Sequence, residues 1–71
     1  MTDDKIEIKI GKRIKELRGK LDISQEELGF RSGVHRTYIA SLEVGKRNIS
    51  IVTLEKIVNA LEVSLSEFFD F

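Results

Sequence analysis

The sequence predicts an all-α fold of five short helices in a single domain that spans residues 1–71. Three observations predict it: apolar residues repeat at intervals of three and four along most of the chain, Ser-x-x-Glu boxes precede two of the apolar segments, and glycines stand where such segments end. A chain this short buries only about 60 to 65% of its unfolded surface, so we expect self-association to stabilise it.

The first helix is expected to run to about Lys20, with a cap supplied by Thr2, Asp3 and Asp4. Its apolar stripe consists of Ile6, Ile10, Ile14, Leu17 and Leu21. Gly11 inside this helix costs about 1 kcal/mol relative to alanine, which indicates either close packing or simple tolerance. Asp22 follows the helix, and aspartate can adopt the left-handed conformation that a helix end requires.

Residues of about 24–43 are predicted to form two short helices joined by a tight turn. Ser24 and Glu27 make a capping box, Gly29 lets the helices cross closely, and Gly33 can take the positive φ of the corner. The second helix turns apolar residues inward, namely Val34, Ile39 and Leu42, and leaves Arg36, Thr37, Ala40 and Ser41 for water or for DNA. This pattern is typical of a helix-turn-helix, whose second helix presents its first residues to the major groove.

The C-terminal helices, about 51–69, are expected to support a dimer. A fourth helix follows Ser50 with a core face of Ile51, Leu54, Ile57, Val58 and Leu61, and a capping box of Ser64 and Glu67 starts a fifth helix through Phe69. One of the three terminal phenylalanines can be core. The surplus predicts a dimer surface made of Val52, Leu65, Phe69 and Phe71, the alternative being a disordered tail.

Composition excludes several classes of protein. There is no cysteine and one histidine, so we expect no disulfide, no metal, no cofactor and no catalytic site, and a reducing cytoplasm is the natural compartment. A signal peptide is not expected because the first twenty residues are charged, and no apolar run is long enough to span a membrane.

The charge distribution is more informative than the net charge of zero. Residues 1–20 and 31–47 each carry a net charge of +3, whereas residues 21–30 and 48–71 each carry −3. DNA responds to the local field, which is screened over about 8 to 10 Å. The basic block around the second helix of the turn therefore suits a nucleic-acid partner.

The chain resembles the lambda-repressor-like, or Cro/XRE-type, helix-turn-helix family through the segments SQEELGFRSGV and LEVGKRN. Within that family it is similar to the controller proteins of restriction–modification systems. This narrower resemblance is carried by His35-Arg36-Thr37-Tyr38-Ile39, by GKRNISIVTLEKI, and by Leu65-Ser66-Glu67-Phe68-Phe69. The similarity extends from about Ile10 to the end of the sequence.

The resemblance implies roles for four polar residues outside the base-reading face. Arg18 and Glu43 would form a structural ion pair, although two solvated charges are the simpler reading. Gln25 would contact phosphate and brace a base-reading residue. Glu26 matches one position of an acidic patch that touches the RNA polymerase sigma subunit in activating relatives, but Phe30 stands where another acid is expected.

Arg36 and Thr37 are the residues that we expect to read bases, because arginine is the commonest bidentate partner of guanine and a threonine methyl packs on thymine. Ser41 lies one turn further along that face. His35 is expected near the phosphate backbone, and Tyr38 either donates its hydroxyl to a phosphate or packs its ring at the helix edge. The loop residues Lys46, Arg47 and Asn48 are expected to clamp phosphates.

The sequence therefore predicts a homodimeric regulator that binds a pseudo-palindromic, double-stranded DNA operator. Resemblance to the controller proteins further implies a switch for a restriction endonuclease operon, activating at one occupancy and repressing at a higher one. An antitoxin-type module, in which the terminal aromatic residues bind a toxin and DNA binding is secondary, is the alternative. An enzyme has almost no support, since the chain has no glycine-rich phosphate loop and no set of catalytic side chains.

Overall fold

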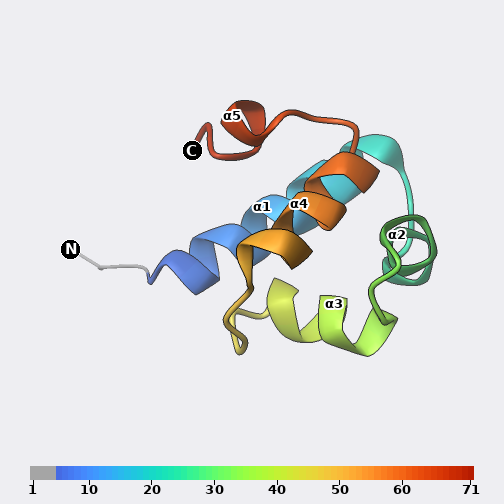
Figure 1. Ribbon diagram of the computed structural model, residues 1–71, viewed down its shortest axis with the longest axis horizontal. Coiled ribbons are helices and arrows are strands. Elements are labelled where there is room, and N and C mark those ends of the chain that lie inside the picture. The colour runs from blue at the N-terminus through green and yellow to red at the C-terminus, as the bar shows by residue number, and fades with distance from the viewer. Residues whose placement is uncertain (1–4) are drawn as a thin grey trace.

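A computed structural model describes residues 5–71, and all of the regular structure in this range is helical. The helices are α1 (Ile6–Leu21), α2 (Gln25–Ser32), α3 (Arg36–Glu43), α4 (Ile51–Ala60) and α5 (Leu65–Phe68), as Figure 1 shows. The all-α prediction of five helices is confirmed. The predicted cap at Thr2, Asp3 and Asp4 lies outside the described residues.

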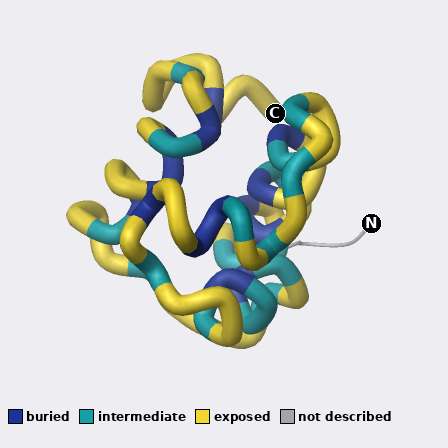
Figure 2. The backbone as a smooth tube through the Cα atoms, turned by 90° about the vertical axis from the view of Figure 1, so that its right-hand side faces the viewer, coloured by how far each residue is buried: buried dark blue, intermediate teal, exposed yellow. Residues whose placement is uncertain are grey.

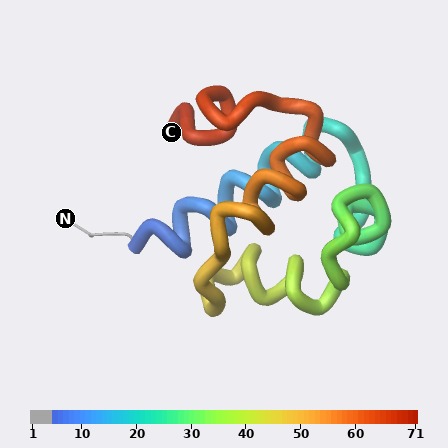
Figure 3. The backbone as a smooth tube through the Cα atoms, viewed as in Figure 1, coloured from blue at the N-terminus to red at the C-terminus, as the bar shows by residue number. Residues whose placement is uncertain are grey.

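The helices are arranged so that α3 lies along one side of the molecule and α5 along the opposite side (Figures 1 and 3). Helix α3 packs against α1 and α2, and α4 packs against α2 and α5. The turn between α2 and α3 lies at one end of the molecule, and the start of α1 points toward the other. The outer side of α3 is consequently not covered by any described helix.

The core lies where the helices face one another, and Figure 2 shows its buried positions in dark blue. Its apolar members come from all five helices and the residue after α4: Ile10, Ile14, Leu17, Leu28, Ile39, Leu42, Leu54, Ile57, Val58, Leu61 and Phe68. Ile51 was predicted on the core face of α4, and that prediction is wrong because its side chain is 77% exposed. Periodicity identifies the apolar face of a helix but not how much of its length is covered by other elements. Ile51 is the first residue of α4, and the covered part of the apolar face begins after it.

Close backbone contacts explain two of the helix glycines. A Cβ atom added at Gly29 would lie 2.6 Å from the carbonyl oxygen of Val34, which confirms the close crossing of α2 and α3. A Cβ atom at Gly11 would overlap the carbonyl oxygen of Leu42, so close packing, not tolerance, accounts for this glycine. Helix α1 can thus lie directly against the last turn of α3.

Most of the helix ends have the conformations and caps that were predicted from the sequence. Asp22 and Gly33 both have positive φ angles, 57° and 75°, as their positions after α1 and α2 require. Ser24 accepts a hydrogen bond from the Glu27 amide, but the Glu27 carboxylate pairs with Arg31 at 2.8 Å. The reciprocal half of the predicted capping box is therefore missing at α2.

The C-terminal segment is held against α1. Its capping box is complete: Ser64 and Glu67 each accept from the backbone of the other, and the hydrogen bond from the Ser64 amide holds the pKa of Glu67 below its usual value. Arg13 donates to the carbonyl oxygens of Phe68 at 2.8 Å and Glu67 at 2.6 Å. The alternative of a disordered tail is wrong, although α5 ends at Phe68, one residue earlier than predicted.

Candidate nucleic-acid interface

The first residues of α3 form an exposed edge next to α2. His35 is the N-cap of α3, and its Nδ1 atom accepts a hydrogen bond from the Thr37 amide at 3.2 Å. If Nδ1 accepts, the ring proton lies on Nε2, which leaves a donor on the other side of the ring. His35 was predicted to lie near phosphate. Its capping role was not predicted, because histidine is not among the usual N-cap residues.

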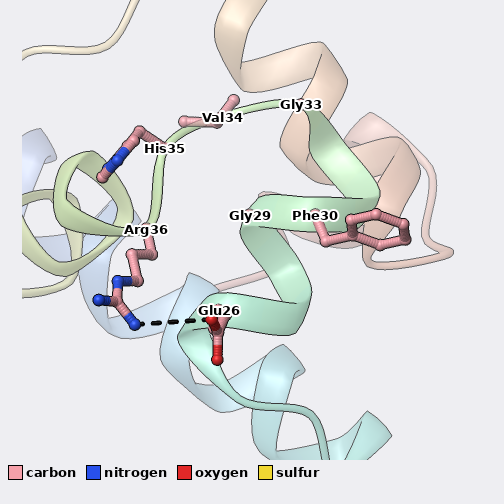
Figure 4. A pocket seen from close by; sticks show the side chains of 7 residues that line it. All are labelled: Glu26, Gly29, Phe30, Gly33, Val34, His35 and Arg36. Atoms are coloured by element: carbon pink, nitrogen blue, oxygen red, sulfur yellow. Dashed lines mark ion pairs between the residues drawn. The ribbon is translucent and has the colours of Figure 1, made fainter.

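Arg36 and Thr37 are both exposed, and both belong to the first turn of α3. The Arg36 guanidinium extends toward α2, where its Nη1 atom lies 3.6 Å from a carboxylate oxygen of Glu26 (Figure 4). Ser41 is half-buried and donates to the carbonyl oxygen of Thr37 at 3.1 Å. The outward edge of α3 is thus formed mainly by its first two residues.

Tyr38 connects α3 to the loop that follows it. Its hydroxyl donates to the carbonyl oxygen of Asn48 at 3.1 Å, and the Arg47 guanidinium lies 5.2 Å from the centre of its ring. The ring also packs against the core as a half-buried group. Tyr38 was predicted either to contact a phosphate or to pack at the helix edge. Its hydroxyl contact with Asn48 was not predicted, because no local pattern indicates a pair ten residues apart.

The loop itself presents Lys46, Arg47 and Asn48 to solvent. Gly45, with a φ of 76°, turns the chain out of α3, and the Lys46 amide donates back to the carbonyl oxygen of Ser41 at 3.1 Å. Together with the Tyr38 contact, this bond keeps the two basic side chains beside α3. The local charge of this side of the molecule is therefore positive, apart from Glu26.

Arg18, Gln25 and Glu43 form one hydrogen-bonded group behind the exposed edge. The Arg18 guanidinium donates to both carboxylate oxygens of Glu43, at 2.8 and 3.0 Å, and Gln25 donates to one of them at 3.0 Å. The Glu43 side chain is only 4% exposed. The hydrogen bonds from Arg18 to Glu43 raise the pKa of Arg18 above its usual value.

This group joins α1, the start of α2 and the end of α3, so it fixes the direction in which α3 is presented. The resemblance implied that Gln25 braces a base-reading residue. In the structure the Gln25 amide donates to Glu43, and the α2 side chain that meets Arg36 is Glu26.

The remaining predicted site residues lie away from this edge. Val52 and Phe71 are 64% and 57% exposed, and Leu65 and Phe69 are 44% and 41% exposed. The first turn of α4 and the segment around α5 lie on the side of the molecule away from α2 (Figure 3). Phe68 is the core phenylalanine, with Phe69 edge-on to it at 5.1 Å between ring centres.

Two further classes of site are not supported within residues 5–71. No group of three or more histidine, cysteine, aspartate or glutamate side chains is close enough to hold a metal ion. Across the same residues, no helix combines the length and apolar character needed to cross a membrane.

Comparison with known proteins agrees with this geometry. A family model described as helix-turn-helix matches residues 14–68, which cover both helices of the turn and most of the core. The chain therefore belongs to the helix-turn-helix family.

Within that family the chain resembles restriction–modification control proteins. It is 48% identical over 65 residues to the control protein C.MunI of Mycoplasma sp, an alignment that covers 90% of this chain and 88% of that protein. A crystal structure of the controller protein C.AhdI from Aeromonas hydrophila shares 41% identity with a TM-score of 0.85, covering 89% of this chain and 91% of that one. The C.Esp1396I tetramer, solved with its natural 35-base-pair operator, shares 37% identity with a TM-score of 0.88, covering 96% and 90%.

Proposed function

We propose that this protein is a sequence-specific, DNA-binding regulator of a restriction–modification operon, acting in the cytoplasm. The observation that carries the proposal is the exposed edge of Arg36 and Thr37 at the start of α3, in a chain whose fold matches an operator-bound controller protein. An edge of this kind suits the major groove, where each base pair has a distinct set of donors and acceptors.

In this proposal Arg36 and Thr37 read bases, and Ser41 supports them from the next turn. Phosphate contacts come from Gln25, at the first turn of α2, and from His35 through its outward donor. Tyr38 adds a third contact when its hydroxyl exchanges the Asn48 carbonyl for a phosphate oxygen. The loop side chains supply the rest, namely Lys46, Arg47 and Asn48. Phosphate contacts fix the register of the protein on the duplex, and the base contacts determine which DNA sequence is recognised.

The operator is bound by a homodimer in this proposal. Val52, Leu65, Phe69 and Phe71, here called the apolar surface, are all exposed. They belong to the first turn of α4 and to the segment around α5, which lie on the side away from α2 (Figure 3). Covering such a surface stabilises a small domain, and a two-fold axis there would present two copies of α3 to successive major-groove faces about 34 to 36 Å apart.

The base-reading role of Arg36 is tested by exchanging it for alanine. Bound duplexes are first selected from a random pool, and the wild type and Arg36→Ala are then titrated against all single-base variants of the selected operator. We expect a loss of about 1 to 3 kcal/mol of discrimination at one position of each half-site. Arg31→Ala is the control, because Arg31 pairs with Glu27 on α2. An unchanged preference profile for Arg36→Ala would contradict the assignment.

Lys46 tests the phosphate contacts of the loop. We expect Lys46→Ala to weaken binding to all sequences about equally and to reduce the slope of log affinity against log salt by about 0.9. The measurement is a titration of the selected operator between low and moderate salt. A change in base preference without a change in slope would assign Lys46 a different role.

The antitoxin alternative and a contact with the RNA polymerase sigma subunit are not part of the proposal. The relatives are control proteins and transcription regulators, which does not favour the antitoxin alternative and gives no support to an enzyme. On α2, the exposed Glu26 lies near Arg36, and Phe30, 84% exposed, occupies the next turn. The acidic patch that the resemblance required for a sigma contact is therefore incomplete.

A further inference from the structure

Glu26 and Arg36 are an ion pair across the turn of the candidate reading motif, and the pair is loose. Its shortest distance is 3.6 Å, and the two side chains are 76% and 61% exposed, respectively. A charge-assisted hydrogen bond between such groups is usually about 2.7 to 2.9 Å long. Arg36 is therefore attracted to Glu26 without being locked to it.

The backbone of the motif creates this pair. Gly29 lies one turn after Glu26, and a Cβ atom there would come within 2.6 Å of the Val34 oxygen and 3.3 Å of the Arg36 nitrogen. The absence of a side chain thus brings the start of α3 against α2. Glu26 and Arg36 both line an open groove of about 460 Å³, and Figure 4 shows their side chains pointing toward each other.

The Arg18–Glu43 pair shows what a fixed ion pair looks like in the same molecule. It has two short hydrogen bonds and a Glu43 side chain that is 4% exposed. The Arg18 guanidinium therefore stays bound to Glu43 and is not available to another partner. The Glu26–Arg36 pair has neither feature. Its guanidinium can leave the carboxylate when a better partner is offered.

We infer that Glu26 is a positioning residue that makes Arg36 selective, and this inference rests on the proposed role of Arg36 in base reading. A guanine offers two acceptors at the spacing of the guanidinium, which a single carboxylate contact cannot match. A backbone phosphate is an anion like the Glu26 carboxylate, so exchanging one for the other gains Arg36 little, and an incorrect base edge offers fewer matching acceptors than guanine does. Arg36 therefore stays with Glu26 on incorrect sequences and transfers to the base only at the correct one.

The consequence of removing the carboxylate follows directly. Without Glu26, Arg36 is free to contact any phosphate, so binding to non-specific DNA strengthens and discrimination at the position it reads weakens. An exposed ion pair contributes about 0.2 to 1 kcal/mol, which corresponds to a change of up to about fivefold in affinity. We expect the ratio of operator to non-specific affinity to fall about two- to fivefold.

The test compares Glu26→Gln with Glu27→Gln in the full-length protein. Glu27 lies on the same helix and pairs with Arg31, so the two variants change the net charge equally but only one releases Arg36. The probes are the operator selected from a random duplex pool, its single-base variants, and a duplex of scrambled sequence. Glu26→Gln should strengthen binding to the scrambled duplex more than Glu27→Gln does and flatten the preference at the position read by Arg36.

The double variant Glu26→Gln/Arg36→Ala completes the experiment. If Glu26 acts through Arg36, the effect of Glu26→Gln on base preference disappears in the Arg36→Ala background. Equal effects of Glu26→Gln and Glu27→Gln would overturn the inference, because charge alone would then explain both. If Arg36→Ala itself leaves the preference profile intact, the proposed reading role fails, which is a separate outcome from the failure of the Glu26 inference.

Discussion

At the scale of single residues, two arginine–glutamate pairs differ in what they can do. Arg18 and Glu43 are bound through two short hydrogen bonds and are mostly withdrawn from water, whereas Arg36 and Glu26 are exposed and further apart. Burial makes the first pair architectural, since an unpaired charge there would be costly. Exposure leaves the second pair free to exchange partners.

The architectural pair predicts a large effect of Glu43→Gln on stability. The substitution leaves the Arg18 guanidinium without a counter-charge, so we expect the free energy of unfolding to fall by about 3 kcal/mol, the lower end of the range for a broken buried pair. Urea unfolding followed by circular dichroism measures it. Glu27→Gln is the matched control, because its pair with Arg31 is exposed and contributes at most about 1 kcal/mol. Equal midpoints for the two variants would refute the architectural role.

At the scale of helices, the position of α3 depends on how closely α1 approaches it. Gly11 lies against the backbone of Leu42 and Glu43, and Gly45 lies against Ile8 of α1. The same helix α1 also carries Arg13, which holds the end of α5. Helix α1 thus connects the candidate reading helix on one side to the apolar surface on the other.

This packing predicts opposite effects for two glycine-to-alanine substitutions in α1. Gly11→Ala should destabilise the fold by about 1 to 3 kcal/mol, since the new methyl group meets backbone that cannot move aside, and this outweighs the gain in helix propensity. Gly19→Ala should stabilise it by about 0.5 to 1 kcal/mol, since nothing lies within 4 Å of a Cβ atom there. Thermal unfolding distinguishes them. A stabilised Gly11→Ala would show that the contact is not tight.

At the scale of the whole molecule, exposed apolar side chains lie mainly on the side away from α2. Val52 lies in the first turn of α4, and Phe69 and Phe71 follow α5. Ile6 and Ile51, at the starts of α1 and α4, are also exposed. An isolated monomer would leave all of them in water. A second copy covering this side would add to the limited burial of a 71-residue chain.

The proposed dimer predicts that a charge on the apolar surface separates the copies. Val52→Asp should shift the protein toward monomer and make its thermal midpoint depend more steeply on concentration, because association stabilises the folded state by mass action. Sedimentation equilibrium at micromolar concentration measures the shift. Phe30→Asp is the control, since Phe30 is 84% exposed but lies on α2. A wild type that is already monomeric would disprove this dimer surface.

Local features of the fold could be predicted from the sequence because neighbouring residues determine them. The periodic faces of the helices, the turn at Gly33, the left-handed Asp22 and the capping box at Ser64 all depend on residues a few positions apart. The edge formed by Arg36 and Thr37 follows from the same periodicity. For these features, spacing and residue type were sufficient.

Only the tertiary structure decided which distant groups meet. It selected Phe68 as the core phenylalanine, left Ile51 in water, and brought Arg13 to carbonyl groups more than fifty residues away. It also determined that Arg36 forms an ion pair with Glu26 and that Gln25 donates a hydrogen bond to Glu43. Such pairings depend on the angles and distances at which helices cross, and those are set by packing of the whole core.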